Sequence, residues 1–439
     1  IVCQAGIMVA TVSDMVLSVG YLLLWIVTWV VYQRRRNVFD GGSAIMLSYI
    51  CYAVFSIITI NDELFSITFE PLRLFPYIYL YLMLMIALWP AVYHHLHPVT
   101  EIEEPHTRML KLTAWLICFC ALCQVPDIAS NFNDGLVMLF TDTDAGKDAY
   151  SEQLSDADEA GTAISNLFAI IYNSLSDVAI FLFFYFLTQK EKNRLLVAGL
   201  GFSIAVGLLI PVMHGQRSGV ILGVLTLILG YFFFQEYYSR MLNLLVRGVG
   251  VVVLAMVALP VAAITFSRFD SMMAGVLGFL NWYIGQANVF FNNYGLDAGG
   301  IRYGDRTLNL FKRLIDSDTP ANFVERREKY HNLELDDYYF STFVGDFTID
   351  FGPYLAIVIF LAFNTFVWYR IRRSGHSVKV HQLLLLYLSM CICMQGGMYL
   401  FAYADTANLR IVTLMGLYAY LCYHEKLLEK YPLENNEQN

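Results

Sequence analysis

Charged residues are scarce in this sequence. Asp, Glu, Lys and Arg make up only 15% of the 439 residues, whereas 57% are hydrophobic and the mean hydropathy is +0.53. Soluble globular chains have about 25% charged and about 45–50% apolar residues. This composition therefore excludes an ordinary cytosolic enzyme and an intrinsically disordered protein. The 28 Lys and Arg against 37 Asp and Glu give a net charge of −9, which argues against nucleic acid as a partner.

The sequence also lacks a disulfide framework and a recognisable metal-binding motif. Seven of the eight cysteines lie in or beside apolar runs, and the CxxC spacing of Cys120 and Cys123 falls within an apolar helix, where cysteine acts as a small hydrophobe. The acidic run around Asp142 and Asp144 misplaces the glycine that a calcium-binding EF-hand loop needs. We expect no metal ion and no cofactor.

Long apolar runs without charges recur along the chain, and they are continuous rather than alternating, which favours membrane-spanning helices over a β-barrel. We therefore expect an all-α, polytopic integral membrane protein whose residues 1–439 form a single membrane domain. The eleven expected spans are roughly 13–32, 43–60, 76–96, 112–129, 163–188, 195–213, 218–235, 243–266, 350–369, 382–403 and 408–424.

The distribution of Lys and Arg predicts the orientation of these spans. Sixteen of the 28 cationic residues fall in one alternate set of connections, from Arg34–Arg36 to Lys430. Short connections rich in Lys and Arg face the cytoplasm, so the N-terminus is expected outside and the C-terminus inside. Residues 272–294 could be read as a further span, but that would place Arg370–Arg373 outside. We therefore expect a re-entrant or interfacial helix there, because five Asn and Gln residues interrupt its apolar face.

Two outer loops carry most of the polar sequence. Residues 130–162 form an acidic loop, which we interpret as a solvated cap. Residues 267–349 form a loop of more than 80 residues, rich in Tyr, Phe and charge, and loops this long are usually functional or disordered. We expect the second loop to be ordered, to contain interfacial helices and to cover the active site.

Arginines near the outer surface are the first candidate site residues. Arg217 lies in a short hairpin, where its guanidinium could bind a phosphate, and Arg268 and Arg410 lie at the outer ends of other spans. Converging, the three would form a pocket for a lipid diphosphate, although each could equally extend to lipid headgroups. His214, three residues before Arg217, is a candidate general base.

The end of the long loop supplies two carboxylates and an aromatic run. Asp346 and Asp350 stand four residues apart and would share one face of a helix, where either could accept a proton from a sugar hydroxyl. Asp350 could instead cap the following helix. Tyr338 and Tyr339 could stack on sugar rings, and ordinary packing accounts for them equally well.

Asp177 lies near the middle of the fifth expected span. Intramembrane carboxylates are usually functional, and a proton-coupled transporter would need such a group. A hydrogen bond between helices is the alternative.

Together these features resemble the Wzy-type polymerases, which join polysaccharide repeat units in O-antigen and capsule synthesis. The matching pieces are Gly215-Gln216-Arg217-Ser218 in an outer hairpin, Thr342 through Asp350-Phe351-Gly352 at the end of the long loop, and the run Tyr283 to Asn288 with Asn292-Asn293. The sequence departs from one arginine motif of that family, because Ile228 stands where the motif has glycine after Arg217.

The resemblance implies a glycosyltransferase of the multi-span C-type superfamily in the bacterial inner membrane. It would transfer the growing glycan from undecaprenyl diphosphate onto an incoming lipid-linked repeat unit, without a metal or nucleotide sugar. Arg217, Arg268 and Arg410 would bind the diphosphate, His214, Asp346 or Asp350 would serve as base, and Tyr338, Tyr339 and Gln286 would contact sugars. A chain-length regulator and membrane lipids are the implied partners.

Two other functions remain open at this point. An O-antigen ligase shares the layout and the outer arginines, but its acceptor is a lipid A core. A lipid-oligosaccharide flippase or another transporter would use Asp177, although the sequence shows neither the internal repeats typical of transporters nor a short outer loop.

Overall fold

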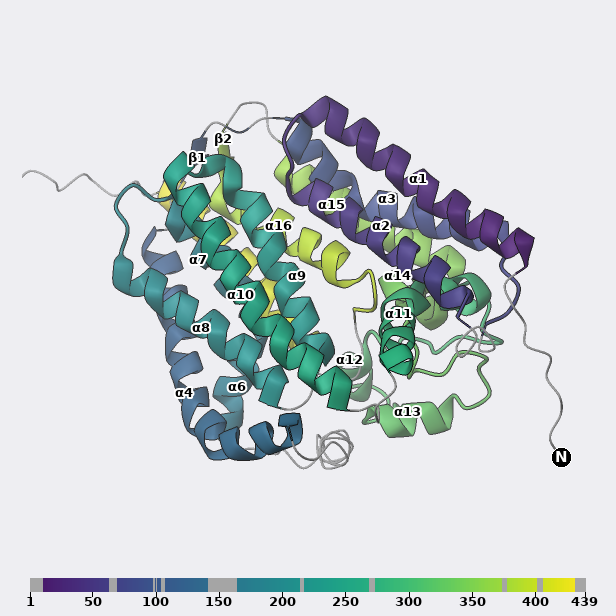
Figure 1. Ribbon diagram of the computed structural model, residues 1–439. Helices are drawn as coiled ribbons and strands as arrows, with labels where there is room; N and C mark the ends of the chain where they lie inside the picture. Colours follow the sequence, from purple (N-terminus) through teal and green to yellow (C-terminus); the bar gives the residue numbers. More distant parts are fainter. Residues whose placement is uncertain are drawn as a thin grey trace, which may run out of the picture.

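The computed structural model describes residues 11–62, 69–97, 99, 101–103, 107–140, 164–213, 217–267, 273–372, 377–400 and 406–430. Within these residues the fold is all-α, as predicted, apart from a parallel pair of three-residue strands, β1 (Glu101–Glu103) and β2 (Ser377–Lys379). Figure 1 shows long helices packed side by side, with the strands at one end of the molecule and the short helices α12 (Asn309–Arg313) and α13 (Phe323–Lys329) at the other. We call these the strand end and the loop end.

Seven described helices are long and apolar enough to cross a membrane. They are α1 (Val12–Arg36), α2 (Gly41–Ile60), α3 (Leu74–Leu96), α4 (Thr107–Phe140), α8 (Arg194–Met213), α9 (Arg217–Phe234) and α15 (Pro353–Ile371). A bent pair, α6 (Ile164–Ser174) and α7 (Ser176–Thr188), is an eighth candidate. The fold is thus that of a polytopic membrane protein, but the described residues do not reach the expected eleven spans.

Helices α10 (Arg240–Ser267), α16 (Val380–Gln395) and α17 (Thr406–Lys430) lie where the other three spans were expected. Several apolar side chains of α10 and α15 are exposed, among them Met241, Leu244 and Tyr354. Exposed apolar faces of this kind suit contact with lipid. Crossing of the membrane by α10, α16 and α17 stays a prediction.

The fifth expected span is not one continuous helix. It bends by 55° between α6 and α7, at Leu175. Leu175 is flanked by serines, and the Ser176 hydroxyl donates to the Asn173 carbonyl at 3.0 Å. Serine and asparagine side chains compete for backbone hydrogen bonds in this way, which weakens a helix. Asp177 lies in the first turn of α7, directly after the bend and near the middle of the bent pair.

Helix α16 ends at Gln395, eight residues before the expected end of its span. A Cβ atom on Gly397 would lie 2.3 Å from the Tyr52 ring, and one on Gly396 would lie 2.6 Å from the Phe343 ring. The two glycines therefore allow a close approach that other residues would prevent. Beyond them the backbone turns to α14 (Thr342–Phe351), where the amides of Thr342 and Phe343 donate to the carbonyls of Met398 and Gly396, both at 2.8 Å.

Helix α11 (Met273–Phe290), expected to be re-entrant or interfacial, packs closely along α2. A Cβ atom on Gly285 would lie 2.4 Å from the Phe55 carbonyl oxygen, and Ser56 Oγ donates to the Gly285 carbonyl at 2.7 Å. Four of the five polar residues that suggested an interfacial helix, all except Asn281, are buried against protein, and Asn288 donates to Ser56 Oγ at 3.2 Å. In the π-helical turn that follows (Phe291–Gly295), Asn292 hydrogen-bonds the backbone of Arg73.

Cationic residues expected on the cytoplasmic side lie together at the strand end. Arg36 forms an ion pair with Glu236, which follows α9, and its Nε lies 3.1 Å from the buried Asp40 carboxylate. Lys379 of β2 lies 2.5 Å from Glu425 near the end of α17. Several connections predicted to share one side of the membrane therefore meet at one end of the molecule.

Candidate functional site

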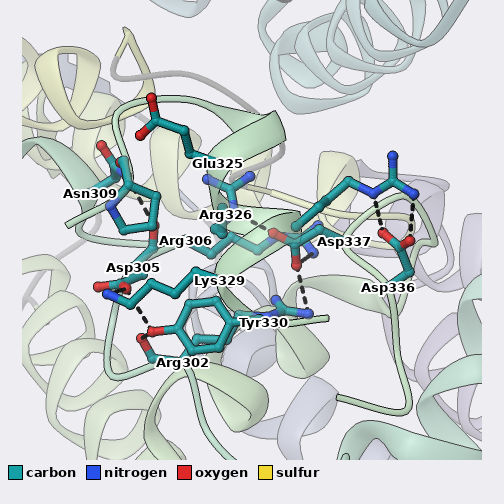
Figure 2. A network of polar contacts seen from close by, with 12 residues as sticks. Arg302, Asp305, Arg306, Asn309, Glu325, Arg326, Lys329, Tyr330, Asp336 and Asp337 are labelled. Atoms are coloured by element: carbon teal, nitrogen blue, oxygen red, sulfur yellow. Dashed lines mark hydrogen bonds and ion pairs between the residues drawn. The ribbon is translucent and has the colours of Figure 1, made fainter. Parts of the chain in front are cut away.

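The long loop is ordered around a cluster of buried charges at the loop end. We call it the loop cluster and define it as Arg302, Arg306, Arg326, Asp337, Asp346 and Asp350. The loop and α13 supply the three arginines and Asp337, and α14 supplies the other two carboxyl groups. Figure 2 shows the arginines converging on Asp337. Every member is at most 4% exposed.

Asp337 is the centre of this cluster. Its Oδ1 lies 2.6 Å from Arg302 Nη2 and 3.2 Å from Arg306 Nη1, and its Oδ2 accepts a hydrogen bond from Arg326 Nε. Burial alone would raise the pKa of Asp337, but the three positive charges outweigh it and hold that pKa well below its usual range. Asp337 is therefore ionised and partly neutralises three guanidinium groups.

Asp346 and Asp350 share one face of α14, as their spacing predicted. Asp346 Oδ1 lies 2.9 Å from Arg306 Nη2, and its Oδ2 accepts from the Leu400 amide at 2.9 Å. Asp350 Oδ2 accepts from the amides of Thr307 at 2.7 Å and Arg306 at 3.3 Å. Asp350 thus fixes the loop, and it does not cap α15, which begins at Pro353 after Gly352.

Burial raises the pKa of both carboxyl groups, and that of Asp350 to about 6. A carboxyl group with such a pKa can exchange protons near neutral pH. Both side chains are 0% exposed, however, so neither reaches a substrate in this conformation.

Beside the loop cluster, Asp305 binds two lysines and a tyrosine. It forms ion pairs with Lys312 and, at 2.9 Å, with Lys329, and its Oδ2 accepts from the Tyr330 hydroxyl at 2.6 Å. Asn408, in the first turn of α17, accepts from the Leu310 amide at 3.0 Å and donates to the Thr307 carbonyl at 2.8 Å. The loop is therefore tied to both α14 and α17.

The candidate sugar-binding residues occupy three different environments. Tyr338 is 54% exposed, and the Arg327 guanidinium lies over its ring at 6.0 Å. Tyr339 is half-buried and stacks on Phe290 with 4.5 Å between ring centroids. Gln286 is buried, and its Oε1 accepts from the Phe340 amide at 3.3 Å. Of the three, Tyr338 has a face open to a ligand.

Two residues singled out separately in the sequence, Asp177 and Arg410, form an ion pair. Arg410 lies in the second turn of α17, toward the loop end, and its side chain is 29% exposed, whereas that of Asp177 is 8% exposed. Asp177 Oδ1 also accepts from Gln395 Nε2 at 3.2 Å, and the same Nε2 donates to Thr226 Oγ1 at 2.8 Å. The pair thus lies between the bend of α6 and α7 and the end of α16.

Residues 396–400 connect this ion pair to the loop cluster. They begin directly after Gln395, which contacts Asp177, and end at Leu400, whose amide binds Asp346. Irregular backbone inside a membrane protein is tolerated where protein or a water-filled space satisfies it. Here the amides of Thr342 and Phe343 in α14 donate hydrogen bonds to two carbonyl groups of this irregular segment. The loop cluster and the Asp177–Arg410 pair are therefore adjoining parts of one region.

The remaining predicted site residues are not placed. His214 and Arg268 lie outside the described residues. Residues 141–162 of the acidic loop lie outside them as well. Arg217 is the first residue of α9, and its side chain is likewise outside the description. The convergence of three arginines on one diphosphate stays a prediction.

Sequence reasoning missed Arg302, Arg306, Arg326 and Asp337. The available signal was the abundance of both charge signs in residues 267–349, which favours internal ion pairs over a uniform surface. Gln395 and Thr226 carried no signal, because single polar residues in apolar helices are common. Among the described residues, no three His, Cys, Asp or Glu side chains gather in a way that could hold a metal ion.

Comparison with protein-family models, with curated proteins and with solved structures finds no match to this chain.

Proposed function

We propose that this protein is an integral membrane glycosyltransferase that polymerises lipid-diphosphate-linked oligosaccharide repeat units at the outer face of the bacterial inner membrane. The observation that carries this proposal is the place of Arg410. The Arg410 side chain is partly exposed between the helices, and Asn408 in the preceding turn of the same helix binds the long loop. A lipid-linked oligosaccharide needs such a junction, because its prenyl chain lies in lipid and its sugars lie in water.

The chemistry follows from the charges. In the proposed reaction the acceptor hydroxyl oxygen attacks the anomeric carbon of the growing glycan, and the bond from that carbon to the diphosphate oxygen breaks. The diphosphate leaves with the bonding electrons, and the hydroxyl proton passes to a base. A guanidinium stabilises the negative charge that develops on the leaving diphosphate, an effect typically worth about 2.7–4 kcal/mol for one donor. Arg410 supplies it, with Arg217 and Arg268 as further candidates.

The exposure of the candidate side chains indicates which of them could act as the base and which could contact a sugar. His214 is the favoured base, because Asp346 and Asp350 are fully buried and engaged with the loop. Tyr338 is the favoured sugar-stacking residue, because its ring is exposed at the loop end. The loop end then faces outward and the cationic strand end faces the cytoplasm, in agreement with the distribution of Lys and Arg. A chain-length regulator is the expected protein partner.

The test is a polymerisation assay with purified protein and lipid-diphosphate-linked repeat units from its own pathway. The wild type is expected to form a ladder of chain lengths, and Arg410→Gln to lower the rate about 100-fold or more. Arg73→Gln is the matched control, because Arg73 is also a cationic residue paired with a carboxylate, Glu70, but at an exposed site. It should retain the ladder. Transfer to a lipid A core without a ladder would instead identify a ligase.

One observation favours a transporter as the second candidate. The bend between α6 and α7 and the end of α16 both lie beside the Asp177–Arg410 pair. Discontinuous helices that meet around charged residues are typical of transporter binding sites. In this case the wild type would move the lipid-linked oligosaccharide from one leaflet of a vesicle membrane to the other and would form no ladder. That result would establish a transporter in place of a polymerase.

A further inference from the structure

The Asp177–Arg410 pair raises a question about any anionic ligand at this site. The carboxylate already occupies the guanidinium that a diphosphate would need. Among the described residues, Asp177 is the partner of Arg410, and contact is made through one terminal nitrogen, Nη2. A guanidinium has five N–H donors and can bind a carboxylate or phosphate through two of them at once. The observed contact therefore uses only part of the binding capacity of Arg410.

Asp177 has a second set of contacts that does not depend on Arg410. Gln395 donates to its Oδ1 at 3.2 Å, and Gln395 is itself held by Thr226, whose hydroxyl donates to the Leu222 carbonyl at 2.8 Å. These neighbours come from α16 and α9 and are uncharged. A carboxyl group that lost Arg410 would keep a hydrogen bond but no counter-ion.

Physical chemistry limits what such a carboxyl group can do. A buried carboxylate without a counter-ion is strongly disfavoured, and a nearby anion disfavours it further, so the group becomes neutral by binding a proton. We propose that Asp177 is an exchangeable counter-ion of Arg410: a diphosphate ester displaces it from the guanidinium, and the released carboxyl group takes up a proton. This inference rests on the proposed function, because it takes Arg410 as a diphosphate-binding residue.

Among the side chains that the structure describes, other charges near α7 do not contact Asp177. Among the helices packed against α7, α8 begins at Arg194, six residues after the end of α7. Helix α16 has His381 in its first turn, paired with Glu425 at the strand end. Asp127 of α4 is exposed, and Arg217 begins α9 with a side chain outside the described residues. Tyr387 is an ionisable neighbour of the network, and its hydroxyl donates to the Thr226 carbonyl at 3.4 Å.

The exchange has a role in catalysis. While Asp177 holds Arg410, the guanidinium is neutralised and cannot trap lipid phosphates nonspecifically. When a diphosphate binds, Arg410 gains a ligand that carries more negative charge than the carboxylate. Asp177 acts only through Arg410, so it is a positioning residue, and its variants must change a property that a purely structural residue would leave unchanged.

That property is proton uptake on binding. The experiment measures farnesyl diphosphate binding to the full chain in detergent by titration calorimetry, in buffers with different ionisation enthalpies, from pH 7.5 to 9.5. The wild type should take up close to one proton per ligand more than Asp177→Asn, which cannot be protonated. The ionisation of the diphosphate itself is common to both proteins and cancels. Asp177→Asn should also bind at least tenfold tighter at pH 9, because no carboxylate competes.

Two controls make the result specific. Asp336→Asn removes an aspartate from an exposed ion pair at the loop end and should leave proton uptake unchanged. Arg410→Gln should abolish binding. If Asp177→Asn does not fold, difference infrared spectroscopy of the wild type replaces it, since binding should produce the carbonyl band of a newly protonated carboxylic acid.

Three outcomes would overturn the inference. The first is wild-type binding with no extra proton uptake. The second is loss of binding in Asp177→Asn, as in Arg410→Gln, which would mean that Asp177 orients the arginine in the complex. The third is full proton uptake on reconstitution with phosphatidylglycerol alone, which would make a bulk phospholipid the ligand.

Failure of the inference is distinguishable from failure of the proposed function. A wild-type ladder with no proton uptake would leave polymerisation intact and refute the exchange. Proton uptake that depends on Asp177, with no ladder from the wild type, would support the exchange at a diphosphate site and refute the reaction assigned to it.

Discussion

The loop cluster and the Asp177–Arg410 pair contain the same two residue types in different arrangements. In the loop cluster three arginines and three aspartates are fully buried and contact one another. In the pair a single aspartate faces a single arginine, whose side chain is 29% exposed. A dense, buried network is costly to disturb, whereas a single accessible contact can be exchanged. The comparison indicates that the loop cluster stabilises the fold and that the Asp177–Arg410 pair is the better candidate for ligand binding.

Asp337→Asn is expected to have the largest effect. It leaves three buried guanidinium groups without their shared counter-ion, and breaking a buried ion pair costs about 3–5 kcal/mol. Nε and Nη1 of Arg302 already have no hydrogen-bond acceptor among the described residues, so this guanidinium has little other compensation. Thermal unfolding in detergent and proteolysis of the loop should both show the loss. Unchanged stability would contradict a structural role for the cluster.

The fold was largely predictable because hydropathy acts locally. Continuous apolar runs located α2, α3, α8 and α9 to within two residues at each end, whereas α4 extends eleven residues beyond its expected end and α16 stops eight residues short of its expected end. The spacing of Asp346 and Asp350 correctly predicted a shared helix face. The helix breaks were not predicted. The bend at Leu175 involves a local serine hydrogen bond of a kind that also occurs within continuous helices, and the end of α16 depends on contacts with distant segments. Gly397, for example, is needed where α16 meets Tyr52 of α2, and no local pattern indicates this.

The candidate site was less predictable for a similar reason. Sequence reasoning selected Asp177 and Arg410 for competing functions, but 232 residues between them hid their contact. It also gave Gln286 a role in sugar binding, whereas the structure has its side chain accepting from the Phe340 amide. A buried glutamine and an exposed one look alike in a sequence. Which polar residue is left accessible is decided by tertiary packing.

Asp350→Asn tests the loop cluster through pH. The folded protein raises the pKa of Asp350 from 3.8 to about 6, so the folded state binds this proton more tightly than the unfolded state. The contribution to stability is therefore complete below about pH 4 and is lost as the pH rises through about 6. Asn cannot ionise, so the variant should be more stable than wild type at pH 7.5 by up to about 3 kcal/mol.

The measurement is the unfolding midpoint of both proteins between pH 4.5 and 8. The difference between them should shrink toward pH 4.5. Parallel pH profiles would show that Asp350 stays ionised in the folded protein and would remove it from the candidates for proton exchange.

Tyr338→Ala tests whether an exposed side chain of the long loop contributes to ligand binding rather than to stability. An exposed ring that stacks on a sugar contributes about 1 kcal/mol, comparable with an aromatic pair, so KM for the repeat unit should rise about fivefold with little change in stability. Tyr339→Ala is the matched control, because the Tyr339 ring stacks on Phe290 at 4.5 Å. It should lower the unfolding midpoint instead. An unchanged KM in Tyr338→Ala would exclude this ring from the sugar site.

Asp336→Asn should have the smallest effect, although Asp336 is adjacent to the critical Asp337. It pairs with Arg327 at 2.6 Å, but the two side chains are 37% and 44% exposed. Exposed ion pairs contribute about 0–1 kcal/mol, because water solvates the separated charges almost as well. The unfolding midpoint should therefore stay close to that of the wild type and should respond weakly to salt. A loss as large as that in Asp337→Asn would mean that the loop depends on its total charge rather than on burial, and the contrast between the two regions would no longer hold.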